Sequence, residues 1–274
     1  MIAPAAAGAR VIEGWWIFPL LGLAAGVLAG LLGIGGGLVL IGALAWLLPS
    51  FGIPKEAAMH AALASSLASI VLTASSSARA HHRRGGVLWP TVAWMVPGLL
   101  LGGWLGSYVA VALAGGVLRW CVAIYCFLVA LQMAFGGPRG GADRAGVVPT
   151  GWPMTLAGSG IGAVSAVVGI GGGSMTVPLL VWRGVVPVRA VGTSSACGIF
   201  IGLASAAGYA VNAPAGALPG HAVGYVYLPA AIGIAVASVL AAPLGTRLAH
   251  AISGAALKRV FALFMVLVGI SLLV

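Results

Sequence analysis

The sequence predicts an all-α polytopic membrane protein built from two inverted-topology repeats. Three observations lead to this prediction: a very apolar composition, a series of apolar runs, and a motif pattern that occurs in both halves. We expect each repeat to hold a glycine-broken hairpin with a half-helix and three transmembrane helices, about eight to ten membrane segments in all. Repeat 1 covers residues 1–136, a connector covers 137–150, and repeat 2 covers 151–274.

The composition indicates that most of this chain is surrounded by lipid. Of its 274 residues, 61% are hydrophobic and 6% are charged, whereas soluble domains carry about 25% charged residues. A chain with so few polar side chains cannot cover a water-facing surface. The net charge of +10 lies in short connectors and not along one helix face. It therefore indicates membrane topology, and no nucleic acid is expected as a partner.

Ten apolar runs lie along the chain, and two of them are too short to cross a bilayer. A crossing takes about 20 residues, each rising about 1.5 Å. The runs at 38–48 and 174–182 are much shorter than that, so we expect half-helices that end inside the membrane. The other runs are 15–32, 57–78, 87–112, 117–135, 152–168, 188–210, 224–249 and 255–274.

The second half of the chain repeats motifs of the first half in the same order. Gly-Ile-Gly-Gly-Gly occurs at 33–37 and 169–173, each time directly before a short run, and the stretch at 62–66 corresponds to 190–194. The other equivalent positions are Pro54 and Pro187, Pro90 and Pro229, Gly106 and Gly245, and Leu118-Arg119 and Leu257-Lys258. Six matches in one order indicate an internal duplication.

The basic residues indicate that the two repeats are inverted. If residues 15–49 crossed the membrane once, the basic residues would divide almost evenly between the two sides. If this segment enters and returns, Arg10, Lys55 and Arg119 remain on one side. The other side then holds Arg79, Arg83, Arg84, Arg139, Arg144, Arg183, Arg189, Arg247, Lys258 and Arg259. The positive-inside rule favours this second arrangement, with both termini outside the cytoplasm.

The two glycine turns are the leading candidates for a binding site. A helix N-terminus presents unpaired N–H groups and about half a positive charge, and glycine has no side chain to keep a ligand away. Two such ends meeting at the membrane midplane would bind an anion without Lys or Arg. The alternative is that the glycines only permit close helix packing. The candidate residues are Gly33, Gly35, Gly36, Gly37, Gly169, Gly171, Gly172 and Gly173.

Small hydroxyls at equivalent positions are the second set of candidates. Ser65 and Ser66 in the first half correspond to Thr193 and Ser194 in the second. Such hydroxyls can donate to an oxyanion that has shed its water, although they also commonly bond to their own helix backbone. The positions of His60, Tyr209 and Asn212 in the repeats make them candidates for gating or coupling.

The acidic residues are few, and this bears on the kind of substrate. Glu13, Glu56 and Asp143 are the only ones, and all three are expected at or beyond membrane ends. Carboxylates inside the membrane usually serve proton relays and cation sites, so their lack favours an anion. An embedded enzyme would need a base, a carboxylate or a metal site. We therefore expect no catalytic residue, no metal and no cofactor.

The paired glycine turns, the Ala-Val-Gly-Thr-Ser stretch at 190–194 and the duplication resemble the TauE/SafE sulfite exporter family, also called the 4-toluenesulfonate uptake permeases. The resemblance covers residues 15–274. It implies transport of sulfur-containing anions, such as sulfite, sulfoacetate or other sulfonates, across a bacterial inner membrane. The first copy has Ala64-Ser65-Ser66 where the family pattern has Gly-Thr-Ser, which leaves the role of Ser65 open.

These observations together predict a secondary transporter for a small sulfur-containing anion, with a passive anion channel on the same scaffold as the alternative. The lipid bilayer is the expected surrounding partner. Proton coupling, sodium coupling and a homo-oligomeric assembly are all compatible with the sequence.

Overall fold

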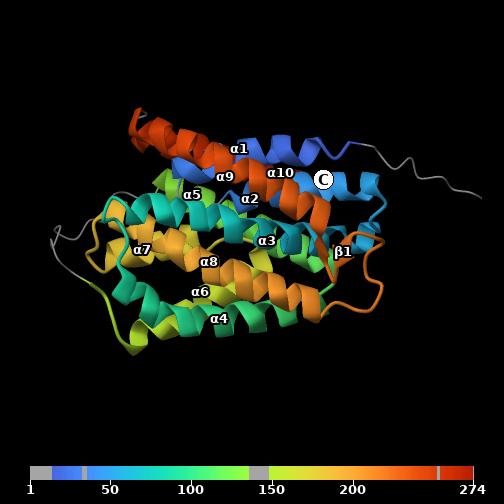
Figure 1. Ribbon diagram of the computed structural model, residues 1–274, viewed down its shortest axis with the longest axis horizontal. Helices are drawn as coiled ribbons and strands as arrows, with labels where there is room; N and C mark the ends of the chain where they lie inside the picture. Colours follow the sequence, from blue (N-terminus) through green and yellow to red (C-terminus); the bar gives the residue numbers. More distant parts are fainter. Residues whose placement is uncertain (1–13, 33–35, 136–147, 252–253, 274) are drawn as a thin grey trace, which may run out of the picture.

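The computed structural model describes residues 14–32, 36–135, 148–251 and 254–273, which are almost entirely helical (Figure 1). These residues form ten α-helices, one 3-10 helix and one two-stranded antiparallel hairpin. In chain order the elements are α1 (Ile17–Leu32), α2 (Gly37–Leu47), η1 (Leu48–Phe51), α3 (Lys55–His82), α4 (Trp89–Ala112), α5 (Gly115–Phe135), α6 (Trp152–Val168), α7 (Gly173–Trp182), α8 (Pro187–Val211), β1 (Ala222–Val223), β2 (Val226–Tyr227), α9 (Leu228–Ala251) and α10 (Gly254–Leu273).

Within the described ranges, five helices are long and apolar enough to cross a membrane. Helices α3, α4 and α8 have 28, 24 and 25 residues, and α5 and α9 each contain an apolar stretch of 18 residues. About 20 such residues span the hydrocarbon core. The predicted all-α polytopic membrane protein is therefore confirmed.

Helices α2 and α7 are short and each follows a glycine turn. They have 11 and 10 residues, which makes each about 15 to 16 Å long, about half the thickness of a bilayer core. Each is preceded by a helix of moderate length, α1 with 16 residues and α6 with 17. We call the pairs α1–α2 and α6–α7 helical hairpins; the described glycines at their tips are Gly36 and Gly37 in the first pair and Gly169, Gly171, Gly172 and Gly173 in the second.

One end of the molecule, which we call the hairpin end, carries the β1–β2 hairpin (Figure 1). Here the Trp15 ring lies edge-on to His221, with ring centroids 5.7 Å apart. Phe18 contacts both Phe51 and Tyr227, with centroids 4.9 Å and 6.1 Å away. The start of α1, the end of η1 and the start of α9 therefore lie together.

The opposite end, which we call the basic end, holds the α3–α4 loop and the start of α8. A methyl group added at Gly192 would lie 2.4 Å from the carbonyl oxygen of Gly86. Helix α6 also begins near this end, because the Thr155 hydroxyl donates to the Trp94 carbonyl at 2.7 Å. The described basic residues near this end are Arg79, Arg83, Arg84, Arg183 and Arg189.

Glycine permits very close contact between the first helix of each hairpin and a long helix from the other half of the chain. A methyl group added at Gly22 of α1 would lie 2.5 Å from the Ile234 carbonyl oxygen of α9. One added at Gly102 of α4 would lie 2.0 Å from the Ser159 carbonyl oxygen of α6. Such contacts are typical of membrane helices, and here they interlock the two halves.

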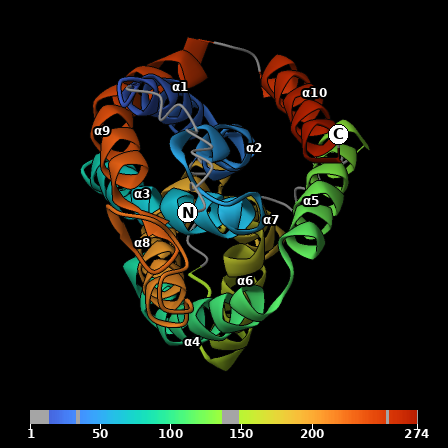
Figure 2. The same ribbon diagram turned by 90° about the vertical axis from the view of Figure 1, so that its right-hand side faces the viewer.

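Helices α3 and α8 pack on each other and are the most buried of the five long helices, whereas α5 and α10 lie together at one side of the molecule (Figure 2). Burial separates the two groups: 78% of the apolar stretch of α3 is buried inside the molecule, whereas the figure for α5 is 33%. The glycine turns lie beside α3 and α8, as the contacts of Ile70 in α3 and Ile201 in α8 show.

Candidate anion site

Left-handed glycines start both short helices. Gly36 is the N-cap of α2 with φ 65°, and Gly172 is the N-cap of α7 with φ 74°. Glycine adopts this conformation without the strain that a Cβ atom brings. Neither N-cap residue makes a side-chain hydrogen bond to the first turn of its helix. The predicted residues Gly33 and Gly35 lie outside the described residues.

The described part of the first glycine turn lies directly against the second turn. A methyl group added at Gly37 would lie 2.7 Å from the Gly169 carbonyl oxygen and 3.4 Å from the Ile170 Cα atom. Gly169 ends α6 in the left-handed conformation, with φ 74°. The N-terminus of α2 is therefore in contact with the turn that leads into α7.

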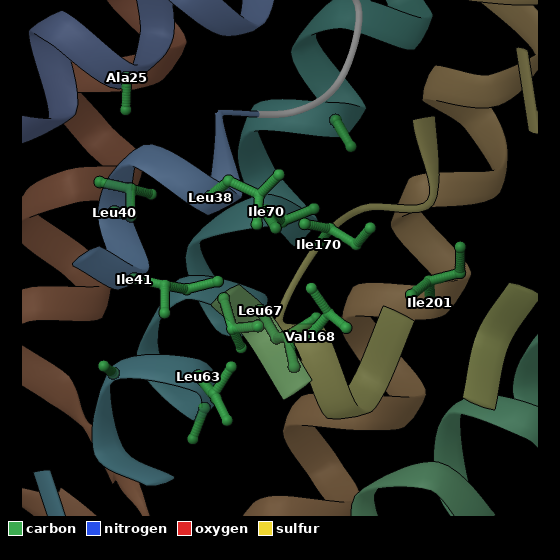
Figure 3. Packing of buried hydrophobic residues seen from close by; sticks show 14 of the residues in the cluster. Ala25, Leu38, Leu40, Ile41, Leu63, Leu67, Ile70, Val168, Ile170 and Ile201 are labelled. Atoms are coloured by element: carbon green, nitrogen blue, oxygen red, sulfur yellow. The ribbon is translucent and has the colours of Figure 1, made fainter. Parts of the chain in front are cut away.

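Apolar side chains fill the space around both turns (Figure 3). Methyl groups of Ile70 lie 2.9 Å and 3.1 Å from the positions where a Cβ would stand on Gly37 and Gly171. A methyl group added at Gly172 would lie 2.4 Å from Cδ1 of Ile201. In this conformation hydrocarbon therefore covers the turns.

Of the predicted hydroxyls, Ser66 is the one that bonds to both turns. Its Oγ donates to the carbonyl oxygens of Gly37 at 3.3 Å and Gly169 at 3.4 Å. Its counterpart Ser194 is 1% exposed, and its Oγ has no hydrogen-bond partner among the described residues. The two equivalent serines thus differ: one hydroxyl closes the contact between the turns and the other is unused.

Ser65 and Thr193 instead accept hydrogen bonds from distant backbone groups. The N–H of Tyr227 donates to Ser65 Oγ at 3.0 Å, and the N–H of Leu88 donates to Thr193 Oγ1 at 3.0 Å. The spacing between Leu88 and Tyr227 is the same as that between the equivalent prolines Pro90 and Pro229. In each pair, a backbone N–H of one half of the chain therefore donates to a side-chain hydroxyl of the other half.

His60, Tyr209 and Asn212 make contacts away from the tips of the glycine turns. His60 donates from Nε2 to the Leu113 carbonyl at 3.0 Å and stacks on Tyr225, with centroids 4.7 Å apart. Tyr209 is fully buried and donates to the Ala166 carbonyl at 3.1 Å. Asn212 caps the C-terminus of α8 through its side chain, which donates to Gly208 at 2.9 Å.

Three further hydroxyls of the α6–α7 hairpin were not among the sequence candidates: Ser165, Ser174 and Thr176. All three are buried, and Ser174 is hydrogen-bonded to the hydroxyl of Tyr125. A signal was present in the sequence, since the equivalent positions of the first hairpin, at the spacing of Gly33 and Gly169, are Ala29, Leu38 and Leu40. A comparison based on matching motifs passes over such differences.

No carboxylate lies at the glycine turns among the residues that the structure describes. Glu56 is the one acidic residue in the described ranges, and it is exposed in the first turn of α3. Groups of three or more His, Cys, Asp or Glu side chains that could hold a metal ion are not found within these ranges. The N-termini of α2 and α7 contribute partial positive charge at the turns.

The comparisons with known proteins identify a family. The sulfite exporter TauE/SafE family matches residues 18–272 of the chain. The chain is also 33% identical, over 254 residues, to a "Probable membrane transporter protein" of Haemophilus influenzae. This match covers 92% of the chain and 96% of that relative. No solved structure matches the chain.

Proposed function

Because the chain belongs to the sulfite exporter TauE/SafE family, we propose that it is a secondary transporter for sulfur-containing anions. The substrate class is sulfite or an organosulfonate such as sulfoacetate, carried across the bacterial inner membrane. The observation that carries the proposal is the contact between the two glycine turns, each of which leads into the N-terminus of a half-length helix. Such termini attract anions without a basic side chain.

The proposed membrane topology is two inverted repeats with both termini in the periplasm. Two observations support it. Helix α1 begins at the end that carries the β1–β2 hairpin, and α6 begins near the basic end. The helical hairpins α1–α2 and α6–α7 therefore enter from opposite ends. Five of the described basic residues gather near the basic end, while Lys55 and Arg119 lie at the hairpin end. The positive-inside rule then puts the basic end in the cytoplasm.

Alternating access follows from how the turns are covered. The proposed anion site consists of glycines from both turns and two hydroxyls: Gly36, Gly37, Gly171, Gly172, Gly173, Ser66 and Ser194. Gly33 and Gly35, which lie outside the described residues, are also proposed to belong to it. Since Ile70 and Ile201 cover the turns, an anion reaches them only when a hairpin moves relative to α3 and α8. Rocking of one repeat, or of its hairpin, against the other would open one end at a time. His60 is the proposed coupling residue, with a proton or sodium as the coupling ion.

Specific binding is tested most simply by thermal unfolding of the purified protein at fixed ionic strength. The compounds to compare are the anions sulfite, sulfate, thiosulfate, sulfoacetate and acetate, and the zwitterion taurine. A ligand present at a hundred times its Kd stabilises the folded state by about 2.7 kcal/mol. We expect one sulfur oxyanion to raise the Tm and acetate to leave it unchanged.

A glycine variant ties that stabilisation to the turns. Gly172→Val should lose the ligand-induced rise in Tm, since even a methyl group there meets Ile201. Gly171→Ala is the milder variant, because its methyl would meet Ile70 at 3.1 Å. Gly160→Val is the matched control in α6, where a Cβ has open space. A full Tm rise in both turn variants, or none in the wild type with any sulfur oxyanion, would contradict the proposal.

A further inference from the structure

The proposed function leaves open which side chain binds the anion beside the backbone N–H groups. Resting on that function, we propose that Ser165 of α6 is a ligand of the transported oxyanion and donates a hydrogen bond to it at the N-terminus of α7. This residue lies outside the hydroxyl set that the duplicated motifs single out.

The hydroxyl of Ser165 is buried and unused. The residue is 0% exposed, and its Oγ has no hydrogen-bond partner in the described parts of the chain. Its carbonyl oxygen, in contrast, accepts from the N–H groups of both Gly169 and Ile170, at 2.7 Å and 3.1 Å. The backbone of Ser165 therefore fixes the glycine turn, while its side chain makes no bond that contributes to this turn.

That hydroxyl lies close to the start of α7. A methyl group added at Gly172, the N-cap of this ten-residue helix, would lie 3.5 Å from Ser165 Oγ. The first N–H groups of a helix lack partners inside the helix. A serine hydroxyl beside them adds a donor that can rotate toward an oxyanion, so the two kinds of donor converge on one place.

The first hairpin cannot offer the same group. The residue equivalent to Ser165 is Ala29, and the residues equivalent to Ser174 and Thr176 are Leu38 and Leu40. All three of these apolar residues are buried. The anion should therefore lie off the centre of the molecule, on the side of the α6–α7 hairpin.

Ser194 of α8 belongs to the same side of the site. Its hydroxyl is buried without a partner among the described residues, and Gly198, one helical turn further on, approaches the Gly171 carbonyl. The sequence spacing puts Ser194 on the face of α8 that carries Gly198 toward this turn, so it is a second unused hydroxyl on this side of the site. The side chains of Ile161 and Ile201 now fill the space at Gly172, and an anion would have to displace them.

The test compares two serine-to-alanine variants in the wild-type background. Ser165→Ala should raise the Kd for sulfite or sulfoacetate, measured by ligand-induced thermal stabilisation, by about tenfold or more, which is the effect of losing a hydrogen bond to a charged group. The KM for uptake into proteoliposomes should rise in parallel. Ser205→Ala is the matched control, since Ser205 is also buried and unpartnered but faces Gly103 of α4.

The outcomes separate this proposal from the proposed function. Unchanged Kd and KM in Ser165→Ala, with wild-type binding intact, would overturn the role of Ser165 and leave the transporter standing. Equal losses in Ser165→Ala and Ser205→Ala would also overturn it, because the effect would then not depend on the glycine turn. If the wild type binds and transports neither anion, the proposed function is wrong and this proposal with it. Ser165→Thr, which keeps the hydroxyl, should retain more affinity than Ser165→Ala and guards against a variant that fails to fold.

Discussion

At the scale of single residues, equivalent hydroxyls in the two halves serve different purposes. Ser66 bonds to carbonyl oxygens of both glycine turns, whereas the Ser194 hydroxyl has no described partner. Removing the hydroxyl that donates to a buried carbonyl raises the free energy of the folded state. Removing a hydroxyl that has no partner breaks no hydrogen bond. The two serines should therefore be distinguishable by stability alone.

Ser66→Ala is expected to lower the free energy of unfolding by about 1 kcal/mol, because its two long hydrogen bonds disappear. Ser194→Ala should stay within about 0.5 kcal/mol of the wild type. Thermal unfolding in one detergent without added anion measures both variants. An equal fall in Tm for both would show that the Ser66 bridge to the turns contributes nothing specific.

At the scale of the elements, each end of the molecule is fastened by a hydroxyl from one half and a backbone N–H from the other. Ser65 of α3 accepts from Tyr227, the last residue of β2 before α9, and Thr193 of α8 accepts from Leu88, the N-cap of α4. The first contact lies at the hairpin end and the second at the basic end. The proposed alternating-access cycle requires the two ends to open separately, and each of these two contacts lies at one end only.

Ser65→Ala should increase hydrogen exchange at residues 225–228 and leave 86–89 unchanged, because only the Tyr227 N–H loses its acceptor. Thr193→Val should produce the reverse pattern. Hydrogen exchange followed by mass spectrometry resolves both segments in the purified protein. If either variant loosens both ends equally, the two contacts do not act as separate fastenings.

The sequence predicted the elements better than their contacts. The helix positions, the short helices after the glycine turns and the membrane class follow from apolar run lengths and glycine motifs, which are local properties. The partner of Ser65 is 162 positions away, and it depends on how α1, α4, α6 and α9 interlock. Ser165 lies outside the shared motifs, because these mark what the two halves have in common, and the equivalent position in the first half is Ala29.

At the scale of the whole molecule, glycine-mediated packing joins the first helix of each hairpin to a long helix of the opposite half. Helix α1 packs on α9 and α6 on α4 through glycine, so each hairpin is anchored to the opposite half by its first helix. In the proposed carrier mechanism, the short helices α2 and α7 are the parts expected to shift over Ile70 and Ile201. A carrier with one site exposed to each side in turn matches this arrangement.

The measurement that tests the central claim most directly is counterflow of labelled sulfite in proteoliposomes. A carrier exchanges substrate through one site, so liposomes preloaded with unlabelled sulfite should take up label faster than empty ones. We predict this acceleration, with an uptake rate that saturates with concentration. A rate that rises linearly with concentration and does not respond to preloading would contradict the carrier and favour an anion channel.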